Sequence, residues 1–244
     1  MRKTLIVARR EMANYLFSPM AYVVGAVFLA VSSILFFYGF PPLRVDPVFV
    51  NGGEASLKTL FYDLAWVMVF IAPLLTMRLV SEEYRSGTIE KLATAPISET
   101  AIIVGKFLGV LALYAMLLAT TLVFLILVAS FGKPDPGVAL MGCLGMLLLG
   151  AAFLAVGLFT SCLTRYQVLA AVVGIVILSS FTLLMQTLAE GGSEFLPFYK
   201  LNVMTHLRDF ATGFFDTRAV VYFLSATVLF LFLSVKALES RRWR

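Results

Sequence analysis

The sequence predicts an all-α integral membrane protein with six transmembrane helices. Hydrophobic residues make up 61% of the 244 and charged residues only 14%, and the mean hydropathy is +0.96. A soluble domain is about 45–50% apolar and about 25% charged. The long apolar runs are continuous, whereas the strands of a transmembrane barrel alternate apolar and polar residues. The chain is therefore expected to be a helical membrane protein.

Six apolar runs reach the roughly 20 residues that cross a hydrocarbon core. They are Met20–Phe40, Leu60–Leu79, Ala101–Phe131, Val138–Leu163, Val168–Leu188 and Ala219–Leu238. The third run has 31 residues and must tilt, kink or extend beyond the bilayer. In the second run, Pro73 predicts a kink. We expect residues 1–244 to form a single transmembrane domain.

The distribution of cations predicts the orientation. With six spans both termini lie on one side, and that side would hold thirteen of the 19 Lys and Arg residues. These are Arg2, Lys3, Arg9, Arg10, Arg78, Arg85, Lys91, Lys106, Arg165, Lys236, Arg241, Arg242 and Arg244. The remaining six cations lie on the other side, and this excess predicts that both termini are cytoplasmic. The net charge of +5 is then a signal of topology and does not indicate nucleic-acid binding.

Residues 2–17 precede the first span and are too short and too polar to cross the membrane. On a helical wheel Leu5, Ala8, Met12, Tyr15 and Leu16 share one side, opposite Lys3, Arg10 and Asn14. This pattern predicts an amphipathic helix in the inner interface, with basic residues toward anionic lipid. The alternative is a short basic flank. Ser18 and Pro19 are expected to end this helix and to begin the first span.

Between the second and third spans, residues 81–98 form a charged segment. Gly87 permits a sharp chain reversal, and Thr88 can cap a short helix that begins at Ile89. Apolar residues recur at helical spacing from Ile89 to Pro96, where the helix should end. Before it, Glu82, Glu83 and Arg85 are expected to present their charges to the cytoplasm. The segment is either a helix that docks on a soluble partner or a solvated loop that enforces topology.

Other polar residues offer little catalytic chemistry. The sequence contains no phosphate-binding loop of the pattern G-x-x-x-x-G-K-[ST] and no cluster of Cys and His. Cys143 and Cys162 are nineteen residues apart in one predicted helix, or roughly 28 Å, too far for a disulfide. We therefore expect no enzyme activity, no metal site and no cofactor in this chain.

The predicted spans contain few ionisable residues. Asp63 lies near an outer end, and Arg78 and Lys106 lie near inner ends, where snorkelling would keep their charges in water. The neutral residues Ser179, Thr182 and Gln186 share one face of the fifth span and could line a pathway, or they could form interhelical hydrogen bonds. Gly105-x-x-x-Gly109 and Ala170-x-x-x-Gly174 permit close helix contact.

Together these features resemble the permease subunits of ABC-2-type transporters over nearly the whole chain. The inner segment from Glu83 to Pro96 is similar to that family's E-x-x-x-G-T-x-E-x-L-x-x-x-P signature. The Arg9-Arg10-Glu11 stretch leading to Tyr15, the turn from Ser161 to Arg165, and Gly213–Asp216 before the last span also resemble the family. Within it, the chain looks most similar to the branch of gliding-motility-associated permeases and the permease of nitrous-oxide-reductase maturation.

The resemblance implies a subunit of an ATP-driven exporter in the bacterial cytoplasmic membrane, built from two six-span permeases and two cytoplasmic ATPase subunits. ATP and magnesium would bind only to those partners, and lipid and an auxiliary envelope protein are further expected partners. The residues implied to touch the ATPase are Glu82, Glu83, Arg85, Gly87, Thr88, Ile89, Glu90, Leu92 and Pro96 in a coupling helix, Thr164 and Arg165 in the second inner turn, and Arg9, Arg10, Glu11 and Tyr15 in the amphipathic helix.

Two other functions fit a protein of this composition. A secondary carrier is disfavoured because such carriers place ionisable residues in the interior of their spans, where this sequence predicts none. A membrane anchor of a motility or envelope assembly would need neither coupling nor a pathway.

Overall fold

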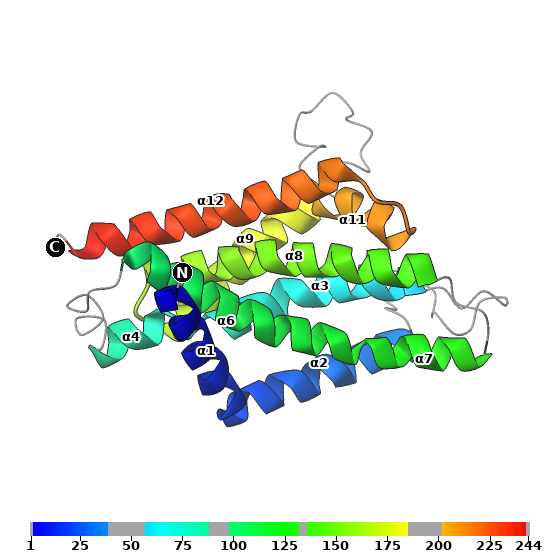
Figure 1. The fold of residues 1–244 in the computed structure, drawn as a ribbon, viewed down its shortest axis with the longest axis horizontal. Helices are drawn as coiled ribbons and strands as arrows, with labels where there is room; N and C mark the ends of the chain where they lie inside the picture. Colours follow the sequence, from blue (N-terminus) through cyan, green and yellow to red (C-terminus); the bar gives the residue numbers. More distant parts are fainter. Residues whose placement is uncertain (1, 39–56, 88–97, 132–135, 185–201, 243–244) are drawn as a thin grey trace.

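The apolar runs form helices that lie side by side along the long axis of the molecule (Figure 1). The computed structural model describes residues 2–38, 57–87, 98–131, 136–184 and 202–242. The helices are α1 (Arg2–Leu16), α2 (Pro19–Tyr38), α3 (Leu57–Thr76), α4 (Ser81–Ser86), α6 (Glu99–Thr120), α7 (Leu122–Phe131), α8 (Pro136–Leu163), α9 (Gln167–Ser179), the π-helix η2 (Ser180–Leu184), α11 (Val203–Ala211) and α12 (Thr217–Arg242).

Four of the described helical stretches are long and apolar enough to cross a membrane. They are Lys58–Ser86, Glu99–Ala129, Gly137–Leu163 and Thr217–Ser240. Two shorter apolar helices, Tyr22–Phe37 and Gln167–Leu183, correspond to the predicted first and fifth spans. The chain is thus an integral membrane protein. Its N-terminus, its C-terminus and α4 lie at one end of the bundle, which we call the α4 end (Figure 1).

The long third run is interrupted, as its length suggested. Helix α6 ends at Thr120 and α7 begins at Leu122. The hydroxyls of Thr120 and Thr121 donate to the carbonyls of Leu117 and Leu118, at 2.6 and 2.7 Å. The backbone N–H of Thr121 also donates to Leu118, three residues back. This tightened turn separates the two helices.

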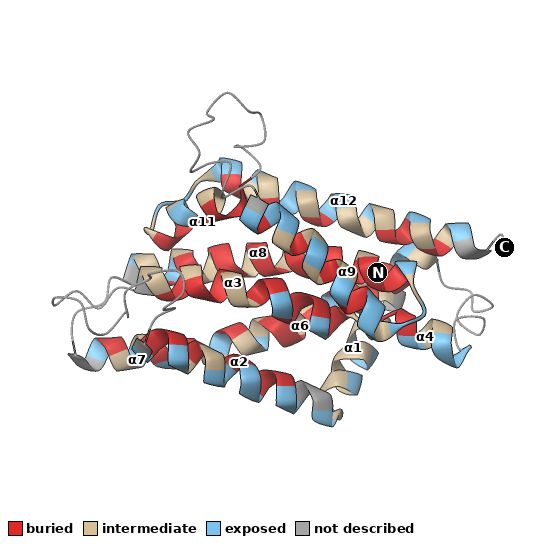
Figure 2. Ribbon diagram, turned by 180° about the vertical axis from the view of Figure 1, so that it is seen from behind, coloured by how far each residue is buried: buried red, intermediate tan, exposed pale blue. Residues whose placement is uncertain are grey.

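Helix α8 is the centre of the bundle and contacts α3, α6, α9, α11 and α12. Buried residues concentrate on the sides of α3, α6 and α8 that face one another, while α2 and α12 expose their outer sides (Figure 2). In the middle of the bundle the Tyr114 hydroxyl donates to the carbonyl of Met146 at 2.8 Å. A Cβ atom at Gly150 would lie 2.1 Å from the Tyr114 ring, so this glycine lets α6 and α8 approach closely.

A short helix precedes the last apolar helix. In the sequence Leu201, Met204, Leu207, Ala211 and Phe214 recur at helical spacing, which predicts a short interfacial or partly re-entrant helix, and α11 occupies Val203–Ala211. Asn202 caps α11 by accepting a hydrogen bond from the N–H of Met204 at 2.9 Å. Met204, Leu207 and Ala211 are buried, whereas Phe214 is exposed. Helix α11 therefore packs on α8 and α3 and does not lie only in the interface.

The packing of α8 on α3 generates a prediction. A Cβ atom at Gly157 would lie 2.0 Å from the hydroxyl oxygen of Thr76. We expect Gly157→Ala to lower the stability of the detergent-solubilised protein by about 1–3 kcal/mol, because the two helices must separate. Adding Thr76→Ala removes the clashing atom and should restore most of the loss. Thermal unfolding of the two single variants and the double variant measures this, and additive effects would contradict the contact.

Candidate functional site

The junction between α3 and α4 is bonded to α8 through one buried hydroxyl. The Ser161 hydroxyl accepts hydrogen bonds from the backbone N–H groups of Val80 and Ser81, both at 3.1 Å. It donates to the carbonyl of Met77 at 3.0 Å. These backbone groups lie where the helical hydrogen bonding of α3 is interrupted. Ser161 therefore supplies the missing partners and ties the start of α4 to α8.

Gly87 ends α4 in the left-handed conformation, with φ of 70°. An L-residue with a Cβ atom is strained there, so glycine suits this position. The chain reversal predicted at Gly87 depends on the residues that follow it and stays a prediction. The residues that follow, including the predicted coupling-helix residues Thr88, Ile89, Glu90, Leu92 and Pro96, lie outside the described part of the structure. Their assignments stay predictions.

A buried lysine joins three helices at this end. The Lys106 ammonium of α6 lies 2.9 Å from a carboxylate oxygen of Glu11 in α1 and 2.7 Å from one of Glu83 in α4. The side chain of Lys106 is only 2% exposed. Burying an ammonium group costs several kcal/mol unless it is paired, and here two carboxylates compensate for it. We call Lys106, Glu11 and Glu83 the ion cluster.

The ion cluster corrects two expectations. Lys106 does not snorkel to water, because its ammonium group is held inside by two carboxylates. Glu83 does not present its charge to the solvent, since it is 16% exposed and directed at Lys106. Glu82 and Arg85 are exposed as predicted, and Glu82 pairs with Arg78 at 3.0 Å on the surface.

Helix α1 packs closely on α6, which brings Glu11 within reach of Lys106. A Cβ atom at Gly105 would lie 2.7 Å from the Cβ of Val7, and one at Gly109 would lie 2.8 Å from the Cβ of Glu11. The predicted close contact at Gly105-x-x-x-Gly109 is thus made with α1. The spacing of the two glycines did not indicate that this short N-terminal helix was the partner.

One side of α1 packs on α6 and another is exposed. The side that contains Val7 and Glu11 contacts α6, and Leu5 is 70% exposed. The interfacial position of α1 stays a prediction. Arg9 and Arg10 are exposed. The Tyr15 hydroxyl donates to the carbonyl of Leu75 in α3 at 2.6 Å. Burial, together with the nearby Glu11 carboxylate, raises the pKa of Tyr15.

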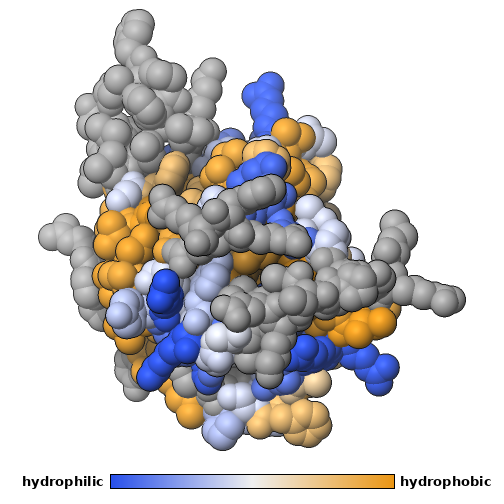
Figure 3. Space-filling model, turned by 90° about the vertical axis from the view of Figure 1, so that its left-hand side faces the viewer, coloured by the Kyte–Doolittle hydropathy of each residue, from blue (hydrophilic) through white to orange (hydrophobic). Residues whose placement is uncertain are grey.

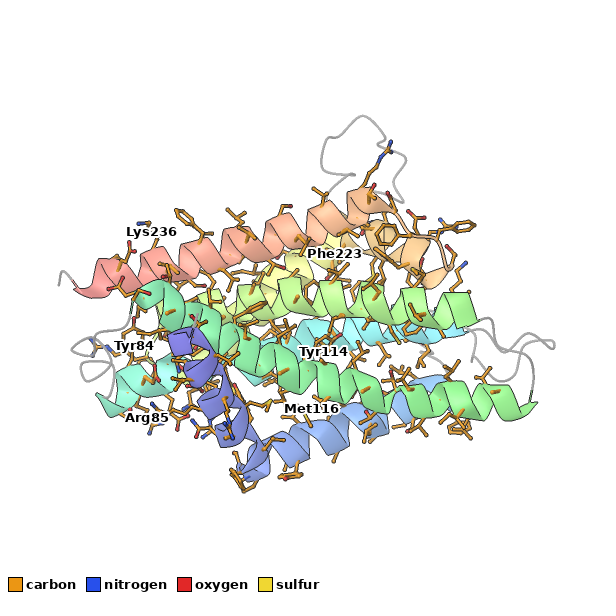
Figure 4. All side chains as sticks on the ribbon, viewed as in Figure 1. Tyr84, Arg85, Tyr114, Met116, Phe223 and Lys236 are labelled. Atoms are coloured by element: carbon orange, nitrogen blue, oxygen red, sulfur yellow. The ribbon has the colours of Figure 1, made fainter. Side chains whose placement is uncertain are left out.

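The second predicted turn lies beside α4. Residues 164–166 connect α8 to α9, and both of these helices contact α4. The Thr164 hydroxyl accepts a hydrogen bond from the N–H of Tyr166 at 3.1 Å, and Arg165 is exposed. Figure 3 looks onto this end and shows hydrophilic side chains gathered there, with apolar surface around them. Tyr84 and Arg85 also lie at this end, whereas Tyr114 lies nearer the middle of the bundle (Figure 4).

The proposed pathway residues of the fifth span are bonded within their own helix. The Ser179 hydroxyl donates to the carbonyl of Ile175, and the Thr182 hydroxyl donates to that of Leu178 at 2.9 Å. Neither interaction is an interhelical hydrogen bond, and Gln186 lies outside the described residues. Their place in a pathway stays a prediction.

Two ionisable side chains are buried in the apolar helices, contrary to the expectation of none. Lys106 and Asp63 are each 2% exposed. Asp63 lies in the second turn of α3, close to the end of an apolar run. That position in the sequence does not indicate that its side chain is buried. Cys143 and Cys162 are free, as predicted. Across the described ranges, no group of three or more His, Cys, Asp or Glu residues could hold a metal ion.

Comparison with known proteins gives one match. The family model described as "ABC-2 family transporter protein" matches residues 5–212. This range includes most of α1, the α3–α4 junction, the ion cluster and α11. No curated protein matches the chain.

The ion cluster generates a second prediction. We expect Lys106→Met to destabilise the protein by about 3–5 kcal/mol, because Glu11 and Glu83 would be left buried without a cation. Adding Glu11→Gln and Glu83→Gln should recover most of this stability. The matched control is Arg78→Met, which breaks an exposed pair and should cost less than about 1 kcal/mol. Thermal unfolding in detergent compares these three variants with the wild type, and equal losses in Lys106→Met and Arg78→Met would contradict the cluster.

Proposed function

We propose that this chain couples ATP hydrolysis by a separate ATPase to export. The premise is that the chain belongs to the ABC-2 transporter family and is the permease component of an ABC transporter. Permeases of this family work with a cytoplasmic ABC ATPase, so ATP and magnesium would bind to that partner. The substrate path would lie between two copies of the chain, or between this chain and a homologous permease.

The observation that carries this proposal is the attachment of α4 to three other helices. The ion cluster links α4 to α1 and α6, and Ser161 links the α3–α4 junction to α8. A force applied to α4 would therefore reach the rest of the bundle through short polar contacts. Movement of packed, rigid elements past one another is a common way to open a membrane path.

The surface that we assign to the ATPase lies at the α4 end. Glu82, Arg85 and Gly87 are exposed there, and Arg165 is exposed in the neighbouring α8–α9 turn. Glu83, Glu11 and Tyr15 act inside this surface as links between helices. The remaining contact residues would be Thr88, Ile89, Glu90, Leu92 and Pro96 in the coupling helix, Thr164 in the second turn, and Arg9 and Arg10 in α1.

We further propose that the α4 end is cytoplasmic and that the chain resides in the bacterial inner membrane. Both termini lie at this end (Figure 1), and the excess of Lys and Arg predicted for the cytoplasmic side supports the orientation. Its six apolar helical segments would be the six spans, the two shorter ones included. The N-terminal Arg9-Arg10-Glu11 stretch and the Glu83–Pro96 signature support the ABC-2 assignment. Within that family we propose the branch of the gliding-motility-associated and nitrous-oxide-reductase-maturation permeases, which the chain resembles.

One observation favours a second candidate, a secondary carrier. Buried ionisable residues are typical of carriers coupled to protons or ions, and Asp63 and Lys106 are both buried. The ion cluster gives Lys106 a structural reason to be buried, and the family match favours coupling to ATP. Transport that persists after deletion of the ATPase gene would identify a carrier.

The first experiment is affinity purification of the tagged chain from its native membrane in mild detergent, with mass spectrometry and an ATPase assay. We expect a nucleotide-binding protein at equal stoichiometry and hydrolysis that vanadate inhibits. Recovery of the chain alone, or only with structural proteins of the envelope, would overturn the proposal in favour of a carrier or an anchor.

The backbone of Gly87 provides a specific test of coupling. We expect Gly87→Val and Gly87→Pro to abolish permease-dependent ATPase activity, because neither residue adopts φ of 70° readily and the following segment would be redirected. The matched control is Gly87→Asn, since asparagine tolerates this conformation and should retain activity. Glu90→Arg should also uncouple the complex. All variants should remain in the membrane, and full activity in Gly87→Pro/Glu90→Arg would contradict the coupling role.

A further inference from the structure

Asp63 is a buried carboxylate that the proposed coupling does not use. It lies in the second turn of α3, at the end of the bundle opposite α4, and is 2% exposed. Neither carboxylate oxygen has a hydrogen-bond partner in the described structure. Lys106 is equally buried but is bonded to two carboxylates, so the two sites differ in whether the charge is satisfied.

An unpaired buried carboxylate is costly. Removing an ionised carboxylate from water without a partner costs several kcal/mol, and proteins usually pair such groups or keep them neutral. Buried ionisable residues in membrane helices commonly mark ligand or ion pathways. Asp63 is therefore a candidate ligand-binding residue, and the ligand would supply the partner that its carboxylate lacks in the described structure.

The side of α3 that carries Asp63 is open further along the helix. Trp66, Val67, Phe70 and Leu74 follow Asp63 at intervals of three, four, seven and eleven residues, which places all five on one side of the helix. Phe70 is 54% exposed and Leu74 is 39% exposed, while Trp66 and Val67 are half-buried. We call these five residues the α3 stripe.

The openness of the α3 stripe is unusual for this helix. The span that contains α3 is the most enclosed of the four long spans, with 67% of its most apolar window buried against 28% for that of α12. Lipid chains could cover Phe70 and Leu74, but lipid is a poor neighbour for the carboxylate at the head of the same stripe. A ligand with an apolar body and a cationic group would match both parts.

The chemistry of the stripe selects among cations. A hard inorganic cation takes about six oxygen ligands, whereas no group of three or more His, Cys, Asp or Glu residues that could hold a metal ion occurs in the described ranges. A large organic cation is weakly hydrated and is bound by a carboxylate together with aromatic faces. Trp66 is three residues from Asp63, so the two side chains are neighbours on the helix surface.

We propose that Asp63 binds the positively charged group of an amphiphilic organic cation, and that the rest of the α3 stripe holds the apolar part of that molecule. This inference rests on the proposed transport function, because it names the class of substrate that the same permease would carry. Its test requires no ATPase, so a failure of coupling would leave the result interpretable.

The test measures binding of two ions of the same shape and opposite charge. The full chain is placed in lipid nanodiscs, and binding of tetraphenylphosphonium and of tetraphenylborate is measured by equilibrium dialysis against empty nanodiscs. We expect saturable binding of the cation only, weakened about tenfold or more in Asp63→Asn, as for the loss of one charge-assisted contact. Asp63→Glu should retain part of the affinity. The matched control Asp216→Asn alters an acid that accepts a hydrogen bond from the N–H of Arg218 at the start of α12, and should bind like the wild type.

A second readout does not depend on the probe. If the Asp63 carboxylate is held without a partner, the isosteric Asp63→Asn should raise the unfolding temperature of the ligand-free chain, and Asp216→Asn should not. The proposal is overturned if the cation does not bind selectively, if Asp63→Asn binds it as the wild type does, or if sodium or potassium chloride displaces it as effectively as a second organic cation.

Discussion

The salt bridges of Lys106 with Glu11 and Glu83 are the interaction on which the arrangement of the α4 end depends. Each of the three helices contributes one charged group, so no pair of helices satisfies the cluster without the third. Removing either carboxylate would leave the buried ammonium group only partly compensated, which is costly where water is excluded. The positions of α1, α4 and α6 are therefore mutually conditional, and a displacement of one must be followed by the other two.

Close packing makes these polar contacts possible. Helices in a membrane gain little from burying apolar side chains, because lipid is equally apolar, and small residues that let backbones approach are correspondingly important. Gly105 and Gly109 bring α1 onto α6, and Gly157 brings α8 onto α3. At these separations a short side chain such as Ser161 can reach three backbone groups of the α3–α4 junction. The hydrogen bonds then fix the relative position of helices that apolar contact alone would allow to slide.

The sequence predicts those features that depend on nearby residues. Run length and composition locate the apolar helices, and periodicity locates α11, whereas α4 and the Asn202 cap of α11 were not predicted. The ion cluster could not be predicted, because Glu11 is 95 residues from Lys106 and the packing side of α1 depends on contacts with α6. Near the end of an apolar run, a lysine that snorkels and one that is buried with partners have the same sequence pattern. For the same reason the sequence did not show that Asp63 is buried. The roles assigned to residues 88–96 of the coupling helix rest on the sequence alone.

Helix α3 connects the two regions with proposed roles. Asp63 and Thr76 are thirteen residues apart, or roughly 20 Å along the helix, and the α3–α4 junction follows directly. At that junction α3 is bound to α8 by Ser161 and by the contact of Thr76 with Gly157. We infer that α3 and α8 move together, because separating them would break hydrogen bonds within a close-packed interface. A push on α4 would then be transmitted along α3 and α8 together toward the α3 stripe and Asp63, past Pro73, where the sequence predicts a kink in α3.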